Sequence, residues 1–423
     1  MHNKKLFDYL YLESMKFYEK RMFFDIVEKT WNKGNTEHFF IRLMNTPGCF
    51  LNFFTLNKLA GKGNNIIFEG FRYKDIMNYV SKKSDFNVIA WVGFKEKGRN
   101  IFNQNEIFLP HVYVPHYDIL KKIDEGVIKK DRLNFLIDKI YKDLSEIKNI
   151  LKKINPVAII FQHDTKPRDR AVALAAKQLN IPTIEIQHGL FMYSIDINSG
   201  KATEYSFVWG NFFKELYSEK KLKEKSKTFV LGYPYNLQKI SGNSNDNKTV
   251  VYYLGQNLEE KNKEKFLGPV CDTLLKLIDL SKSLNFEFVY RPHGKISDAL
   301  KNEIPDLPIS SENEKLEEAF EKGDIFISYN STALIEASIY ENITIQLKNI
   351  PYQTDDLEKS GAVTKSSDTL EDLSEYLEEI IKSQNLKKIK KPFNKNYIEI
   401  PNSPGKRLIN LLNEKIIFDS KEM

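Results

Sequence analysis

Apolar runs and helical periodicities alternate along the middle of the chain and predict an α/β protein. Short apolar runs, bounded by polar residues or glycine, stand at 87–94, 156–164 and 181–189 and are typical of buried strands. Between the last two, "RDRAVALAAKQLN" at 168–180 has the pattern of a helix, as does 134–154. A strand, a helix and a strand with short connections form a βαβ unit, which indicates a parallel sheet covered by helices.

The pattern continues in two series that a polar stretch separates. Strands are predicted at 205–210 and 227–234, before "NLQKISGNSNDNK" at 236–248, which contains almost nothing to bury and is typical of a linker. The second series has predicted strands at 249–255, 286–294, 324–332 and 343–347, and predicted helices at 270–284, 313–323 and 332–340. Two Rossmann-like halves of this kind are expected to face each other across a cleft, with ligands at the carboxyl ends of the strands.

The domain prediction follows from these two series. It places an N-terminal Rossmann-like domain at 1–235, a linker at 236–248, a C-terminal Rossmann-like domain at 249–385, and a basic tail and helix at 386–423. The first 85 residues or so are rich in aromatic side chains and show no clear pattern, so no role is predicted for them.

Composition favours a globular cytoplasmic protein. Of the 423 residues, 41% are hydrophobic and 28% charged, and no window approaches the ~18 uncharged apolar residues of a membrane helix. The opening residues lack the apolar core of a secretory signal. Cys49 and Cys271 are the two cysteines, which excludes a cysteine zinc cluster and argues against a disulfide framework.

The net charge of +6 is small for 63 basic and 57 acidic residues, and no nucleic-acid-binding module is visible. Part of the excess is local, in "LKKIKKPFNKN" at 386–396 and "PGKR" at 404–407. This region is either a solvated lysine-rich connector or a contact for anionic lipid or an anionic acceptor, which would hold the protein at the inner face of a membrane.

Two histidines follow consecutive predicted strands of the first half. "FQHD" at 161–164 and "IQHG" at 186–189 should bring His163, Asp164 and His188 together on one rim, with Gln187 and Gly189 beside them. A histidine can take a proton from a hydroxyl at neutral pH, and an aspartate beside it can orient it or serve instead. Gly189 is expected to relieve crowding so that His188 projects into the cleft. Either histidine alone is more typical of a buried structural residue, and it is their paired placement that favours a functional role.

The second half offers two candidate phosphate-binding segments. In "SYNSTALIEA", Asn330, Ser331 and Thr332 stand at a predicted helix N-terminus, with Glu336 one turn on where it can accept hydrogen bonds from ribose hydroxyls. The alternative is an ordinary N-cap with a surface acid.

"VYRPHGK" at 289–295 is the other segment. Arg291, His293 and Lys295 concentrate cationic donors at a predicted strand end, which suits phosphate oxygens, although a turn with a structural histidine has the same pattern. The two segments are expected at adjacent strand ends of one sheet.

The order of "IQHG", "FVWG", "VLGYP", "RPHG" and "STALIEA" resembles bacterial capsule and surface-polysaccharide transferases of the GT-B fold, a group that includes polyol-phosphate transferases. It is more distantly similar to bacterial sialyltransferases with a His-Pro motif and a Ser-Ser or Ser-Thr motif. The matched stretch runs from about 156 to 347, and His293-Gly294 and "ENITI" depart from the usual His-Pro and Gly-x-Pro-x-Ile.

The resemblance implies an acceptor-binding first domain, with His188 as general base, and a second domain that binds the nucleotide-sugar. His293, Ser331 and Thr332 would hold the donor phosphate, with Glu336 near the ribose. It favours a CMP-linked donor of sialic acid or Kdo, used as co-substrate without a cofactor, and a surface polysaccharide or lipid-linked glycan as acceptor, in capsule or lipopolysaccharide synthesis.

The predicted function is therefore a metal-independent, inverting glycosyltransferase. No DxD stands at a strand end in the first half, and the nearest acidic pair is "TDD" at 354–356. Transfer of a polyol phosphate from a CDP donor, or of a hexose from a UDP donor, stays open. An epimerase of similar fold would need several acids near the sugar, and only Asp164 and Asp169 are placed there. A non-catalytic protein of polysaccharide assembly is the alternative of another class.

Overall fold

The computed structural model describes residues 56, 59, 63–92, 106–108, 130–164, 167–190, 202–220, 222–235, 248–256, 258, 263–350, 356–383 and 394–417. The chain divides into two compact units. Unit 1 comprises Met1–His188, Asp196–Asn236 and Ile398–Met423, and unit 2 comprises Gly189–Ile195 and Leu237–Tyr397. Almost all of the predicted linker, the basic run 386–393, Cys49 and most of "TDD" lie outside the described residues.

Unit 1 is built on a seven-stranded sheet whose neighbouring strands are all parallel. Its strands are β1 (Asn65–Glu69), β2 (Asn87–Val92), β3 (Glu106–Phe108), β4 (Pro156–Phe161), β5 (Thr183–Ile186), β6 (Tyr205–Val208) and β7 (Thr228–Val230). The order is β3-β2-β1-β4-β5-β6-β7, so it reverses between β1 and β4. Ligands of open parallel sheets bind at the carboxyl ends of the strands beside such a switch point.

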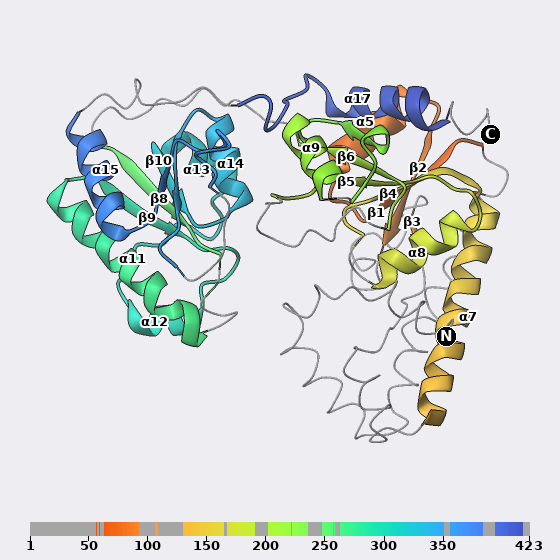
Figure 1. The fold of residues 1–423 in the computed structure, drawn as a ribbon, viewed down its shortest axis with the longest axis horizontal. Helices are drawn as coiled ribbons and strands as arrows, with labels where there is room; N and C mark the ends of the chain where they lie inside the picture. The colour runs from red at the N-terminus through yellow and green to blue at the C-terminus, as the bar shows by residue number, and fades with distance from the viewer. Residues whose placement is uncertain are drawn as a thin grey trace. The chain divides into compact units, whose positions relative to one another are not determined.

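Helices cover both faces of this sheet (Figure 1). They are α5 (Lys74–Lys83), α7 (Lys130–Ile154), α8 (Pro167–Lys177), α9 (Asn211–Glu219) and α17 (Pro404–Leu411), with a 3₁₀ turn η3 (Lys225–Lys227) and a π-helical turn η4 (Leu412–Ile417). Successive strand residues point to opposite faces. Accordingly Ile67 packs in one core with residues of α7 and α8, while Ile66 packs in the other with residues of α5, α17 and η4.

The C-terminal helix belongs to unit 1. The sequence prediction treated 386–423 as a separate basic tail and helix, but α17 packs against α5, and Leu408, Leu412 and Ile416 are fully buried there. Basic Lys406 and Arg407 lie on the outer side, where Arg407 pairs with Glu399 at 2.7 Å.

Unit 2 is a five-stranded parallel sheet of order β12-β11-β10-β8-β9. Its strands are β8 (Val250–Leu254), β9 (Glu287–Arg291), β10 (Ile325–Ser328), β11 (Ile343–Leu347) and β12 (Lys365–Ser367), and its helices are α11 (Lys263–Ser283), α12 (Asp298–Glu303), α13 (Leu316–Lys322), α14 (Thr332–Ile339) and α15 (Leu370–Lys382). The switch point lies between β8 and β10. The prediction that the strands before "RPHG" and "NST" are neighbours is wrong, because β8 lies between β9 and β10.

The predicted α/β class with two Rossmann-like domains is confirmed, and all the predicted strands and helices occur. Within the described residues, no helix combines the length and the apolarity needed to cross a bilayer.

Candidate functional site

The turn after β5 is held by the strand next to it. The Gln187 side chain is 1% exposed, and its Oε1 accepts the backbone N–H of Trp209 at 3.0 Å. The Trp209 indole N–H in turn donates to the Gln187 carbonyl at 2.8 Å. Gln187 therefore fixes the direction of the chain before His188, whereas the sequence prediction had its side chain on the rim.

Residues after β1 hold the same turn from the other side. The Tyr73 hydroxyl donates to the Ile186 carbonyl at 2.9 Å, and Arg72 Nη2 donates to the His188 carbonyl at 3.1 Å. Burial raises the pKa of Tyr73 well above its usual range, so this hydroxyl keeps its proton as a donor. The His188 backbone is thus fixed, and the residue as a whole is part-exposed with its Nδ1 buried.

His163 and His188 come together as predicted from consecutive strands. β4 and β5 pair directly, and the two imidazole rings lie edge to face with centroids 5.3 Å apart. His163 Nδ1 lies 3.1 Å from Asp169 Oδ2, which is supplied by the first turn of α8. An aspartate at this position orients the imidazole and stabilises its charged form.

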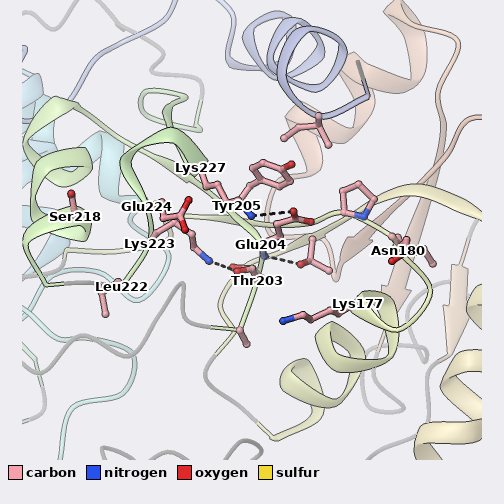
Figure 2. Close-up of a pocket in the computed structure, with 15 residues that line it drawn as sticks. Lys177, Asn180, Thr203, Glu204, Tyr205, Ser218, Leu222, Lys223, Glu224 and Lys227 are labelled. Atoms are coloured by element: carbon pink, nitrogen blue, oxygen red, sulfur yellow. Dashed lines mark hydrogen bonds and ion pairs between the residues drawn. The ribbon is translucent and has the colours of Figure 1, made fainter. Parts of the chain in front are cut away.

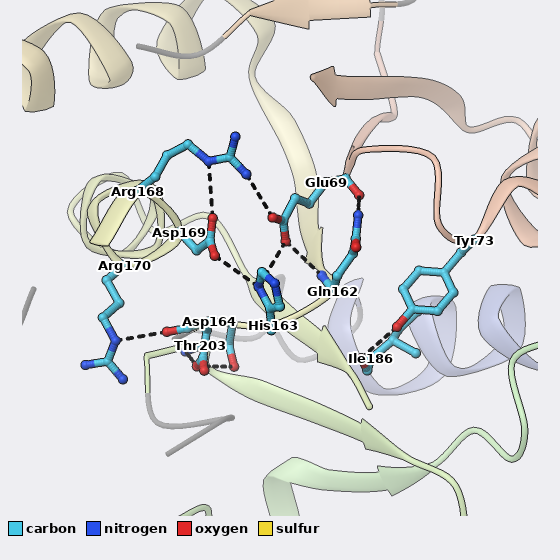
Figure 3. Close-up of polar contacts among 10 residues, drawn as sticks. All are labelled: Glu69, Tyr73, Gln162, His163, Asp164, Arg168, Asp169, Arg170, Ile186 and Thr203. Carbon is cyan, nitrogen blue, oxygen red and sulfur yellow. Dashed lines mark hydrogen bonds and ion pairs between the residues drawn. The ribbon is translucent and has the colours of Figure 1, made fainter. Parts of the chain in front are cut away.

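A second carboxylate, from the end of β1, completes the cluster (Figure 3). Glu69 Oε2 lies 4.0 Å from His163 Nδ1 and accepts the Gln162 backbone N–H at 3.0 Å. Arg168 bridges the two acids, donating to Glu69 at 3.0 Å and to Asp169 at 3.3 Å. Burial, followed by the nearby Asp169 carboxylate, raises the pKa of Glu69 to about 7.

Glu69, His163 and Asp169 carry potential ligand atoms within 4.8 Å of one another, so they are the described residues that could hold a divalent cation. Arg168 already bonds one oxygen of each carboxylate. Two buried carboxylates with one guanidinium leave a single negative charge, which one additional proton neutralises. The cluster is therefore suited to binding and releasing a proton near neutral pH.

Asp164 does not join this cluster. Its carboxylate is fully buried and accepts the backbone N–H groups of Ala202 and Thr203 at 2.6 and 2.9 Å, and the Thr203 hydroxyl at 3.2 Å. Asp169 takes the orienting position that the sequence prediction gave to Asp164. Glycine is also not required at 189: its φ is not in the left-handed region, and an added Cβ would lie at an ordinary 3.5 Å from Thr332 Oγ1.

In unit 2, the predicted phosphate-binding turn lies at the switch point. Asn330 follows β10, and its backbone N–H donates to Gln256 Oε1 at 3.1 Å while its carbonyl accepts from Gln256 Nε2. Gln256 follows β8, so one side chain joins the two strand ends. Ser331 caps α14 by accepting the Ala333 N–H at 3.2 Å.

Thr332 begins α14, and its Oγ1 accepts the Leu190 N–H at 3.2 Å, within the segment that groups with unit 2. Glu336, one turn along, is part-exposed. Both interpretations of this turn survive: Ser331 is an N-cap, and the helix N-terminus it caps lies where ligands of such sheets bind.

Arg291 forms an ion pair with Glu314 and does not face the switch point. Its guanidinium donates to Glu314 Oε2 at 3.0 Å and to the Glu314 carbonyl at 2.8 Å. The Glu314 carboxylate also accepts from Lys322 and from the Tyr252 hydroxyl. β9 is at the edge of the sheet, away from the switch point, so the prediction that Arg291 presents its charge to phosphate is not supported. His293 and Lys295 are exposed.

No protein-family model matches the sequence, and no curated protein sequence matches it. Solved structures do match the fold. UDP-GlcNAc 2-epimerase from Neisseria meningitidis bound to UDP-GlcNAc is 14% identical, with a TM-score of 0.56 over 83% of this chain and 99% of its own.

Methanocaldococcus jannaschii UDP-GlcNAc 2-epimerase, in complex with UDP-GlcNAc and UDP, is 16% identical, with a TM-score of 0.50 over 82% of this chain and 99% of that one. Acinetobacter baumannii MurG is 12% identical, with a TM-score of 0.50 over 83% and 99%. At such identities the likeness shows the fold alone, which confirms the GT-B prediction.

Proposed function

We propose that the chain is a glycosyltransferase that uses a nucleotide-sugar donor, with His188 as the general base that takes a proton from the acceptor hydroxyl. The observation that carries the proposal is the pairing of His188 with His163 at the carboxyl ends of β4 and β5, next to the switch point of unit 1. The GT-B fold, which the chain has in common with MurG, supports it.

The two histidines take different protonation states in this proposal. His163 lies between the Asp169 and Glu69 carboxylates, which favour its imidazolium form. A positive charge on His163 disfavours a second charge on His188, whose ring centroid is 5.3 Å away. His188 then stays neutral and can accept the proton of the acceptor, while His163 stabilises the developing alkoxide.

Unit 2 supplies nucleotide binding. The N-terminus of α14, with Ser331 and Thr332, is proposed to hold the donor phosphate, and Glu336 to accept from ribose hydroxyls. Exposed His293 and Lys295 are proposed to meet the phosphate as its charge grows on departure. Arg291 is left out of this set because Glu314 holds it.

The donor proposed for the first test is a CMP-linked sugar of the sialic acid or Kdo type, because the resemblance of the sequence motifs favours it. UDP-GlcNAc is the second, because two structures of similar fold contain it. CDP-polyols are the third. A surface polysaccharide or lipid-linked glycan is the proposed acceptor, and the cytoplasm the proposed location.

A thermal-shift screen against CMP, CDP, UDP, GDP and ADP identifies the nucleotide, since a ligand of the folded state raises its apparent stability. Donors of the nucleotide that binds are then tested for acceptor-dependent nucleotide release. Binding with no release on any glycan acceptor would contradict transfer, and no binding at all would favour the non-catalytic alternative.

A second function is favoured by one observation. Glu69 and Asp169 place two acids beside His163, and the raised pKa of Glu69 suits proton transfer to and from a sugar carbon. Epimerisation of a nucleotide-sugar is therefore the competing proposal. Incubation of UDP-GlcNAc with the protein in D₂O separates the two, because epimerisation through loss of the C2 proton introduces deuterium at C2, whereas transfer leaves that carbon unlabelled.

A further inference from the structure

A cavity of unit 1 lies away from the histidine pair. It has a volume of about 840 Å³ and is formed at the amino ends of β5, β6 and β7, where Thr183, Tyr205 and Lys227 line it (Figure 2). His188 follows the opposite end of β5, five residues beyond Thr183. At about 3.3 Å per residue this is roughly 16 Å along the strand, so the cavity is a separate site.

Three lysines line this cavity. Lys177 comes from the last turn of α8, Lys223 precedes η3, and Lys227 ends η3. Two carboxylates, Glu204 and Glu224, also line it. Lys227 Nζ forms an ion pair with Glu204 Oε1 at 3.4 Å. With three lysines and two glutamates, the lining of the cavity has one more basic than acidic side chain.

Lys223 is held by the backbone at the wall of the cavity. Its Nζ donates to the Thr203 carbonyl, and its side chain is part-buried. Burial lowers the pKa of Lys223 despite the acidic groups around it. In Figure 2 the Lys177 side chain extends toward the same side of the cavity as Lys223 and Thr203. Ammonium groups from α8 and from the segment before η3 therefore line one cavity.

We propose that this cavity binds a small molecule that carries a phosphate group, held by Lys223 and Lys177 with Lys227 at its side. A phosphomonoester has a charge of about −1.5 to −2 at pH 7 and three acceptor oxygens, which suits several separate ammonium donors. Lysine binds phosphate as a point charge, without the fork geometry of arginine. Asn180, Thr183 and Ser218 offer hydrogen bonds to the rest of the molecule, and the volume lies within the ~300–1,000 Å³ of ligand pockets.

The test is lysine acetylation footprinting of the whole chain, read by mass spectrometry, with glycerol 3-phosphate or inorganic phosphate against chloride at matched ionic strength. Lys177, Lys223 and Lys227 are expected to be labelled at least threefold more slowly with phosphate. Lys282, which is 75% exposed on α11, is the internal control and should not change. Equal labelling at the three lysines overturns the proposal, and so does equal protection at Lys282, which indicates non-specific screening.

Lys223→Met is expected to abolish the protection of Lys177 without a change in the thermal midpoint. If that variant does not fold, Lys177→Met serves instead, and protection of Lys223 should fall. Unchanged protection in a folded variant overturns the proposal. If phosphatidic-acid vesicles slow the labelling of the three lysines and soluble phosphate does not, the assignment to a small molecule is overturned. A His188→Asn variant should keep the protection in full, so failure of this proposal and failure of the transferase proposal are distinguishable.

Discussion

Replacement of Glu69 by glutamine is expected to change how the stability of unit 1 depends on pH. In the folded chain, burial and Asp169 raise the pKa of Glu69 from 4.5 to about 7. Its proton binding therefore stabilises the fold fully below pH 4.5, and this contribution is lost as the pH rises through 7. With about 1.36 kcal/mol per pKa unit, the loss between pH 5 and pH 8 amounts to about 2.5 kcal/mol.

Urea unfolding followed by tryptophan fluorescence measures this effect, because Trp91 and Trp209 are buried in unit 1. The free energy of unfolding of the wild type minus that of Glu69→Gln should fall by about 2.5 kcal/mol from pH 5 to pH 8. Glu215→Gln, at a site 49% exposed and paired with Lys225, is the matched control and should give a pH-independent difference. A difference for Glu69→Gln that is the same at both pH values would refute the assignment of a shared proton to this cluster.

Three further predictions follow from single contacts. Gly70→Ala should lower the free energy of unfolding in urea by about 1–3 kcal/mol, because the φ of Gly70 is +60° and the new Cβ would lie 2.8 Å from Gln162 Nε2. The control is Gly268→Ala, in a helix where the new Cβ meets open space, and it should be neutral or stabilising. Arg291→Met should lower stability by about 3 kcal/mol and leave nucleotide affinity within twofold in calorimetric titration; a tenfold loss of affinity in a folded variant would restore its phosphate role. Asp164→Asn should lower the thermal midpoint by an amount equivalent to about 2 kcal/mol with kcat preserved, while Asp169→Asn should lower kcat at least ~10-fold in a stable protein; the reverse pattern would contradict the geometry.

The histidine pair could be predicted from the sequence because it depends on one local rule. Strands joined by a short helix are parallel neighbours, so residues that follow them share one edge of the sheet. His163 and His188 obey this rule, and the structure brings their rings together.

Glu69 could not be found in the same way. Its strand "NIIFE" has the same apolar pattern as the others, but it lies in the N-terminal stretch where no series of elements was recognisable. Its place next to β4 depends on a sheet order that reverses across the 86 residues of sequence between Glu69 and Pro156. A central strand of this kind is identified by tertiary pairing and not by local pattern.

The sequence also could not predict which side chains from loops would bond to a candidate site residue. Arg291 has the residue type and position of a phosphate ligand, and only the fold shows that Glu314, in the loop before α13, neutralises it. The C-terminal helix did carry a signal, since Leu408, Leu412 and Ile416 recur at four-residue spacing, but the lysines and arginine around it dominated the interpretation.

The central claim is that His188 is the base for sugar transfer, and the turnover of His188→Asn on the donor identified by the nucleotide screen tests it most directly. The variant should keep its fold and its nucleotide affinity, since Gln187, Tyr73 and Arg72 hold the backbone of this turn. The account predicts a fall in kcat of about 10²–10⁴-fold with the donor KM little changed. A folded variant with wild-type kcat would contradict the account.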